Sequence, residues 1–206
     1  MDPITRIAHA LNSHPVHVID PGDRAHASVA LILSEKPDGV NALLIERSAN
    51  EHDYWSGQVG LPGGRVETSD LGTRYTAERE TREEIGLDLS AARYVGRLGD
   101  YAPGGLRIVI SCFVYAIEEL PVLKPAPTEI ADAFWFRVKE LDNPALRTCV
   151  DLTFRNRTRH FPALQLKDDG QQRLWGITYR LLRNLGKIIT ATEKENPICK
   201  RNFGTQ

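Results

Sequence analysis

The sequence is poor in cysteine and contains no long apolar run, and both absences limit what the chain can be. Its three cysteines, Cys112, Cys149 and Cys199, lie far apart and form no CxxC or Cys/His pair. We therefore expect neither a disulfide framework nor a structural zinc site. No stretch of about eighteen apolar residues occurs, and no apolar signal core follows Met1. Secretion and membrane spanning are disfavoured, and we expect a cytoplasmic protein.

The chain also lacks an excess of charge of either sign. Its 26 basic and 27 acidic residues give a net charge of -1 and a pI of about 6.6. This balance provides no general attraction to nucleic acid or to a membrane surface. A phosphate-bearing ligand must therefore be bound by a local group of residues. With 206 residues, 41% of them hydrophobic, the chain is long enough for one good core.

Apolar periodicity predicts a small set of helices and strands. Strand-like segments, rich in β-branched and aromatic residues, lie at 26–34, 41–47, 93–103, 108–120 and 131–138. The first two are separated by the turn signal EKPDGV and predict a hairpin. Helical spacing predicts a short helix at 4–11 and longer ones at 71–85 and 173–189. Two helices on a mixed sheet indicate an α/β/α sandwich.

The predicted helix at 71–85 carries a group of carboxylates. Glu80, Glu83 and Glu84 lie within about one turn and are expected to project together, with Arg79 and Arg82 alongside. Like charges so placed destabilise a helix by roughly 0.2–0.5 kcal/mol per pair, so a bound cation would account for them. Oxygen ligands select a hard ion such as Mg²⁺ or Mn²⁺. The alternative is ordinary surface ion pairs, for example between Arg79 and Glu83.

A Pro-Gly-Gly turn precedes this helix. Gly63 and Gly64 allow the backbone to approach an ion or a phosphate closely. The order of turn, loop and carboxylate-lined helix therefore predicts a phosphate site.

Residues 61–87, LPGGRVETSDLGTRYTAERETREEIGL, resemble the signature box of the Nudix hydrolases. That box is written G, five residues, E, seven residues, R-E-U-x-E-E-x-G-U, with U apolar. The matching residues are Gly64, Arg79, Glu80, Glu83, Glu84, Gly86 and Leu87. Asp70 replaces the first glutamate, one extra loop residue follows it, and Thr81 occupies the first apolar position.

Residues 43–64, LLIERSANEHDYWSGQVGLPGG, are similar to the upstream motif of the coenzyme A pyrophosphatase-like branch, approximately LLTxRS, a spacer and GQVAFPGG. The spacer here is one residue longer and lacks the branch's usual arginine, with His52 and Asp53 in its neighbourhood. The later segments PTEIADAFWF and LWGITYRLL also resemble this branch. The similarity covers about residues 25–185.

The resemblance implies a Nudix-type α/β/α sandwich with a mixed sheet. We expect a Nudix hydrolase domain at 25–190, after an N-terminal helix and loop at 1–24 and before a polar tail at 191–206. The implied reaction is hydrolysis of a nucleoside diphosphate linked to another moiety. Coenzyme A or acyl-CoA is the expected substrate, giving 3′,5′-ADP and (acyl-)4′-phosphopantetheine. The alternatives are ADP-ribose, a modified nucleotide, or a regulatory module that binds a nucleotide without cleaving it. A homodimer is a family expectation.

The resemblance also implies roles for particular residues. Glu80, Glu83 and Glu84, with a carbonyl of Gly63, are expected to bind Mg²⁺ or Mn²⁺. Arg79 is expected to orient these carboxylates.

The expected catalytic group is Glu83, Glu84, Arg79 and Glu129. Glu129 is a candidate additional ligand or general base, or else a solvated loop residue. Substrate contacts are expected from Arg47, Arg65, Gly64 and Trp55. For Trp135 and Trp175 the alternative to stacking on a base is core packing.

Overall fold

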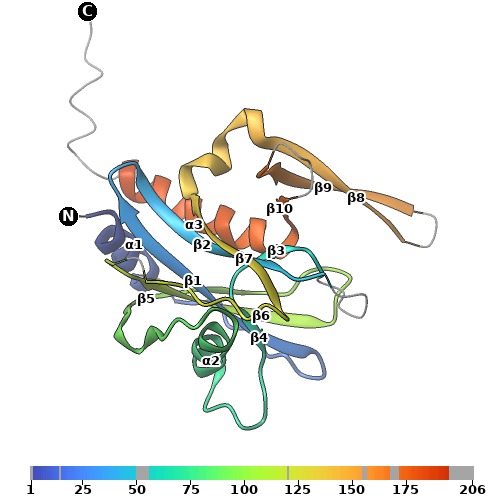
Figure 1. Cartoon of the computed structure of the whole chain (residues 1–206), viewed down its shortest axis with the longest axis horizontal. Coiled ribbons are helices and arrows are strands. Elements are labelled where there is room, and N and C mark those ends of the chain that lie inside the picture. Colours follow the sequence, from blue (N-terminus) through green and yellow to red (C-terminus); the bar gives the residue numbers. More distant parts are fainter. Residues whose placement is uncertain are drawn as a thin grey trace, which may run out of the picture.

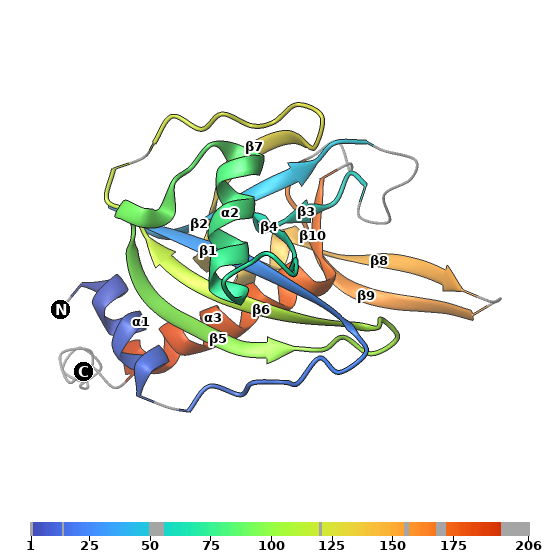
Figure 2. The same ribbon diagram turned by 90° about the horizontal axis from the view of Figure 1, so that it is seen from below.

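The computed structural model describes residues 2–13, 15–49, 56–119, 121–154, 157–167 and 172–194. Runs of consecutive strands, separated by α2 and short 3₁₀ turns, lie between an N-terminal and a C-terminal helix in this part of the chain (Figures 1 and 2). The helices are α1 (Pro3–Asn12), α2 (Thr73–Ile85) and α3 (Gly176–Lys194), with short 3₁₀ turns η1 (Leu89–Ala91), η2 (Val138–Asp142) and η3 (Pro144–Leu146). The strands are β1 (Ala25–Lys36), β2 (Gly39–Arg47), β3 (Val59–Gly60), β4 (Gly63–Arg65), β5 (Arg93–Tyr101), β6 (Ile108–Ala116), β7 (Ile130–Arg137), β8 (Arg147–Phe154), β9 (Arg157–Gln165) and β10 (Arg173–Trp175).

A mixed seven-stranded sheet forms the centre of the described part. Its main order is β3-β2-β1-β6-β5, with β4 paired to β1 and β7 paired to β2. Strands β1 and β6 are parallel, with Val29 opposite Cys112, and the neighbouring pairs are antiparallel. The predicted hairpin at 26–34 and 41–47 is confirmed as β1 and β2.

Helices cover both faces of this sheet, which confirms the predicted α/β/α sandwich (Figure 1). Successive strand residues point to opposite faces, so β1 supplies both cores. Leu31 and Leu33 pack with residues of α1 and α3, whereas Ala30 and Ile32 pack with residues of α2. The sheet is therefore buried on both sides.

Helix α2 has few apolar residues and is held by its buried face. Thr81, at the position where the box has an apolar residue, is 0% exposed. Its hydroxyl donates to the carbonyl of Ala77 at 2.7 Å, so burial leaves no hydroxyl unsatisfied. The helix ends at Gly86, which has a φ of 69° and donates to the carbonyl of Arg82. The predicted C-terminal glycine is confirmed.

The C-terminal region differs from the prediction of one helix over 173–189. Arg173–Trp175 form strand β10, and α3 begins at Gly176, whose φ of 64° turns the chain from strand to helix. The helix extends to Lys194. Strands β8, β9 and β10 form a second antiparallel sheet that the sequence reading did not predict.

No helix of the described ranges is both long and apolar enough to cross a membrane.

Candidate functional site

A cleft of about 540 Å³ lies where the Pro-Gly-Gly turn, helix α2 and the start of α3 meet the sheet. Its size is in the range of small-molecule sites. One part of its wall is acidic, with Glu80, Glu84 and Glu129, and Arg47 and Arg65 add positive charge. The cleft therefore offers groups of both signs to a ligand.

Glu84 is the most buried of the predicted metal ligands. Its side chain is 2% exposed, and it accepts hydrogen bonds from the Gly63 N–H at 2.9 Å and from Arg47 at 3.2 Å. Burial raises the pKa of Glu84 to about 7, and the Gly63 and Arg47 donors oppose this rise. Glu84 thus links α2 to the glycine turn and to β2.

Glu80 lies against the glycine turn. A methyl group built on Gly64 would come within 2.4 Å of the Glu80 carboxyl carbon, so any side chain at this position would displace the carboxylate. A methyl group on Gly63 would lie 2.3 Å from the carbonyl oxygen of Ser28. Backbone packing therefore requires Gly63, whereas a side chain at position 64 would push the end of the Glu80 side chain aside. Burial raises the pKa of Glu80, and the neighbouring Arg79 opposes that rise.

Arg79 forms ion pairs with three carboxylates, those of Asp70, Glu80 and Glu83. It reaches Glu80 and Glu83 at 2.9 Å each, and its Nε donates to Asp70 at 3.0 Å. A further bond of 3.4 Å runs to the carbonyl of Arg65. Arg79 thus contacts three carboxylates, and the Arg79–Glu83 pair is the one that the ion-pair alternative named.

Asp70 occupies the position of the first glutamate of the box and performs a structural task. Its side chain is 1% exposed and also accepts bonds from the Thr76 hydroxyl at 2.7 Å and the Glu67 N–H at 2.9 Å. The Arg79 hydrogen bond holds the pKa of Asp70 well below its usual range. The Asp70 side chain, which is shorter than that of glutamate, therefore joins the loop to Thr76 and Arg79 of α2.

Glu83 is more exposed than the other two predicted ligands, although it shares the Arg79 Nη1 with Glu80. Its side chain is 54% exposed, and it is not among the residues that line the cleft. Of the three predicted carboxylate ligands, Glu80 and Glu84 therefore face the cleft and Glu83 does not. No three histidine, cysteine or acidic side chains within the described ranges gather closely enough to hold a metal.

Glu129 approaches the acidic wall from the loop before β7. The carbonyl of Glu129 accepts from the Ser48 N–H at 2.8 Å, which fixes the loop beside the end of β2. After burial, the negative charge of Glu129 is among the causes that raise the pKa of both Glu80 and Glu84. Its side chain is exposed toward the cleft. Sequence position alone did not reveal this closeness.

The carboxylates of the cleft wall are the type of donor that a hard divalent cation prefers, and they would have to approach one another to bind it together. Glu80 and Glu84 of α2 and Glu129 of the loop before β7 supply carboxylate oxygens. The charge of Glu129 contributes to the raised pKa of Glu80, and the charges of Glu80 and Glu129 contribute to the raised pKa of Glu84. The absence of a side chain at Gly64 leaves space at the cleft wall for one of these carboxylates, that of Glu80. A bound cation would relieve their mutual repulsion.

Among the predicted substrate contacts, Arg47, Arg65 and Gly64 line the cleft. Trp55 lies outside the described residues.

The remaining wall is apolar and was not predicted. It is built from strands β1, β6 and β10 and from the beginning of α3, and it includes Val29, Ile108, Trp175, Ile177 and Leu181. Trp175 is half-buried there, whereas Trp135 packs against the core on the α2 side, as the packing alternative proposed. The glycine at position 176, between a short apolar segment and a helical pattern, is the sequence signal that could have indicated a strand ending at Trp175.

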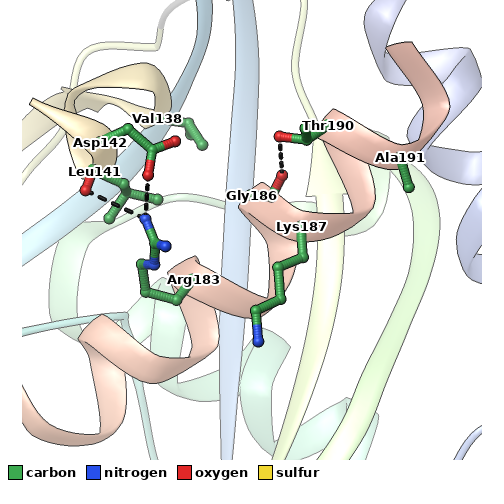
Figure 3. Close-up of a pocket in the computed structure, with 8 residues that line it drawn as sticks. All are labelled: Val138, Leu141, Asp142, Arg183, Gly186, Lys187, Thr190 and Ala191. Atoms are coloured by element: carbon green, nitrogen blue, oxygen red, sulfur yellow. Dashed lines mark hydrogen bonds and ion pairs between the residues drawn. The ribbon is translucent and has the colours of Figure 1, made fainter. Parts of the chain in front are cut away.

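A second hollow, of about 430 Å³, lies between η2 and the C-terminal half of α3 (Figure 3). There Arg183 donates to the carbonyl of Leu141 at 3.3 Å and pairs with Asp142. No predicted site residue lines it, so we place the site in the larger cleft.

The family follows from comparison with known proteins. A model of the NUDIX domain matches residues 24–156, and the chain therefore belongs to the Nudix family. A probable Nudix hydrolase of Schizosaccharomyces pombe is 30% identical over 156 residues, which are 76% of this chain and 53% of that protein. An uncharacterised protein of the same yeast is 30% identical over 64% of this chain and 46% of its own length. The chain thus spans about half the length of these two relatives.

Two further comparisons agree with this family. An uncharacterised Nudix hydrolase of Yersinia pestis, NudL, is 26% identical over 174 residues, which are 81% of this chain and 80% of that protein. The crystal structure of a MutT/nudix family protein from Enterococcus faecalis has a TM-score of 0.53 at 16% identity, covering 94% of this chain and 75% of that one. The structural likeness concerns the fold alone.

Proposed function

We propose that the chain hydrolyses the pyrophosphate bond of a nucleoside diphosphate linked to another moiety. The observation that carries this proposal is the meeting of Glu80, Glu84 and Glu129 at one wall of a cleft that also holds Arg47 and Arg65. Carboxylates that repel one another need a cation, and guanidinium groups bind phosphate oxygens. A module that only binds nucleotides has no need for such a cluster.

Each residue then has a defined task. Glu80 and Glu84 would hold Mg²⁺ or Mn²⁺, joined by Glu129 or, after release from Arg79, by Glu83. The cation, when bound, supplies charge neutralisation of the pyrophosphate and activation of water. Arg47 and Arg65 bind phosphate oxygens and orient the anhydride for in-line attack. Glu129 would accept the proton of the attacking water, and its exposed position at the cleft wall supports this role.

For the substrate we propose coenzyme A or an acyl-CoA, cleaved to 3′,5′-ADP and (acyl-)4′-phosphopantetheine. The support is that residues carrying the resemblance to the coenzyme A branch lie on the cleft wall: Arg47, Gln58, Val59, Gly63 and Gly64. ADP-ribose or a modified nucleotide is the alternative, since the usual spacer arginine of that branch is absent.

A substrate panel tests the proposal. Coenzyme A, acetyl-CoA, ADP-ribose, NADH and nucleoside triphosphates are incubated with Mg²⁺ or Mn²⁺, and the products are identified by mass. We expect 3′,5′-ADP from coenzyme A. Glu84→Gln should lower kcat by about a hundredfold or more, because a charged ligand becomes neutral. Cleavage of ADP-ribose with intact coenzyme A would refute the substrate, and full activity of both Glu83→Gln and Glu84→Gln would refute the site.

A further inference from the structure

The small sheet beside the cleft has two chemically different faces. Its strands β8 and β9 form a hairpin that extends away from the central sheet (Figures 1 and 2). On one face the exposed pair Asp151–His160 faces solvent. The same face carries Leu164 and Leu174 nearer the body, and these two side chains are fully buried in the core on the α3 side. The hairpin is thus anchored through one face.

The other face carries an apolar strip, which we define as Trp175, Phe161, Val150 and Leu152. Trp175 and Phe161 are in ring contact, with centroids 6.0 Å apart. Phe161 is opposite Val150 in the β8–β9 register, and Leu152 follows on the same face of β8. All four side chains are half-buried, and neither core cluster of the described residues contains them.

The strip begins at the wall of the cleft. Trp175 lines the cleft together with Ile177 and Leu181 of α3. Strand β10, which contains Trp175, also contacts β3, and Val59 and Gly60 of β3 line the cleft as well. Because Trp175 is also in ring contact with Phe161, which is opposite Val150, the strip is continuous with the apolar wall of the cleft.

The dimensions and chemistry of the strip suit an aliphatic chain. It crosses three strands, which lie about 4.8 Å apart, and so spans roughly 10 Å. Arg159 is opposite Leu152 in the register and marks the outer end with a charged group. The cleft has a volume of about 540 Å³, which is the size of a compact ligand, and its apolar wall at Trp175 gives a long substituent a surface on which to extend beyond it.

We propose that the apolar strip is a binding subsite for the acyl chain of a thioester substrate. This inference rests on the proposed cleavage of coenzyme A derivatives and adds a selectivity for chain length. Free coenzyme A and acetyl-CoA end before the strip, whereas a medium-length acyl group covers it. Each methylene removed from water contributes a factor of up to about four in affinity.

The experiment measures KM and kcat for coenzyme A and for its acetyl, butyryl, hexanoyl and octanoyl thioesters. We expect KM to fall by at least about tenfold from acetyl to octanoyl, with kcat nearly constant, because the chain contributes binding that is equal in the ground and transition states. Val150→Asp places a carboxylate in the strip and should bring the acetyl-to-octanoyl KM ratio close to one.

A matched control places the same charge on the opposite face of the same strand. Cys149 is exposed there, so Cys149→Asp should keep the wild-type ratio. Thermal unfolding midpoints show whether both variants fold. If Val150→Asp does not fold, the near-isosteric Val150→Thr replaces it and should reduce the acetyl-to-octanoyl KM ratio about two- to threefold.

The possible results distinguish failure of the acyl-chain subsite from failure of the proposed coenzyme A hydrolysis. Cleavage of coenzyme A and all thioesters with one common KM overturns the subsite and leaves the function standing. An equal loss of the ratio in Val150→Asp and Cys149→Asp also overturns it. Failure to cleave free coenzyme A as well as every thioester removes the substrate assignment and the subsite together.

Discussion

Glu84 is a carboxylate that the fold buries before any cation binds. Its two acceptor oxygens are used by the Gly63 N–H and by Arg47, so it is not an orphaned charge. These donors do not fully replace water, because burial still raises the pKa of Glu84 to about 7. Between its ordinary pKa and pH 7, the folded protein therefore binds this proton more tightly than the unfolded chain does.

This difference predicts a pH dependence of stability without metal. A carboxyl whose pKa is raised on folding makes the folded state less stable as the pH rises through the window from about 4.5 to about 7. Glu84→Gln cannot ionise and lacks this contribution. With a chelator present, the unfolding midpoint of Glu84→Gln minus that of the wild type should therefore increase from pH 5 to pH 8, measured by thermal denaturation. A difference that stays constant over this range would contradict a raised pKa of the buried Glu84 carboxyl.

Helix geometry explains which parts of the site could be predicted at this scale. Sequence spacing identified Glu80 and Glu84, which are four residues apart and both line the cleft. Glu83 and Glu84 are neighbours in sequence, so their side chains leave the helix about 100° apart. Glu84 turns toward the sheet and Glu83 toward solvent and Arg79. The nearness of Glu129 depends on a loop conformation that periodicity does not report.

At the scale of elements, α2 is fastened to the sheet by a polar cluster as well as by its short apolar face. The buried Tyr115 of β6 donates from its hydroxyl to Glu78 at 2.7 Å and accepts from Arg74 at 3.1 Å. The Arg74 guanidinium also lies 4.2 Å from the ring centre of Tyr94. The helix that carries the acidic wall is thus tied to β5 and β6 on the side away from the cleft.

Removal of this hydroxyl should therefore weaken the attachment of α2. Tyr115→Phe keeps the ring and leaves Glu78 and Arg74 without their shared partner, so we expect a loss of roughly 1 kcal/mol in unfolding free energy, reduced by the partial exposure of both charged groups. Urea denaturation measures it. Tyr94→Phe, which keeps the stacked ring of an exposed tyrosine, is the control and should stay close to the wild type. Equal midpoints for all three proteins would refute the attachment.

The elements that the sequence predicted are those with strong apolar periodicity. Strands β1, β2, β5, β6 and β7 are rich in β-branched or aromatic residues and are nearly all buried on at least one face. Strands β8 and β9 mix charged residues with Val150, Leu152 and Phe161 and expose much of their surface, so their alternation is weak. Strand β10 has three residues and runs into a helix with a clear apolar stripe. Residues 173–175 form a strand because they pair with β9, and the sequence of a three-residue segment does not reveal such a long-range pairing.

At the scale of the whole molecule, the acidic wall joins segments that are distant in the chain. Glu80 and Glu84 come from α2, Glu129 from the loop before β7, and Arg47 from the end of β2. Unfolding separates these groups and destroys the wall. A cation that binds them together must therefore favour the folded state over the unfolded chain.

Mg²⁺ or Mn²⁺ should accordingly raise the unfolding temperature of the wild-type protein. At a free concentration of about one hundred times Kd the stabilisation is about 2.7 kcal/mol, which for a chain of this size corresponds to a rise of roughly 5–10 °C. Differential scanning calorimetry with chelator or with the cation measures it, and KCl of equal ionic strength controls for screening. Glu84→Gln should lose most of the rise, whereas Glu35→Gln, at an exposed position of the β1–β2 hairpin, should keep it. The same rise in Glu84→Gln as in the wild type would place the cation elsewhere on the molecule, because the neutral amide removes one of the charges that make this wall attractive to it.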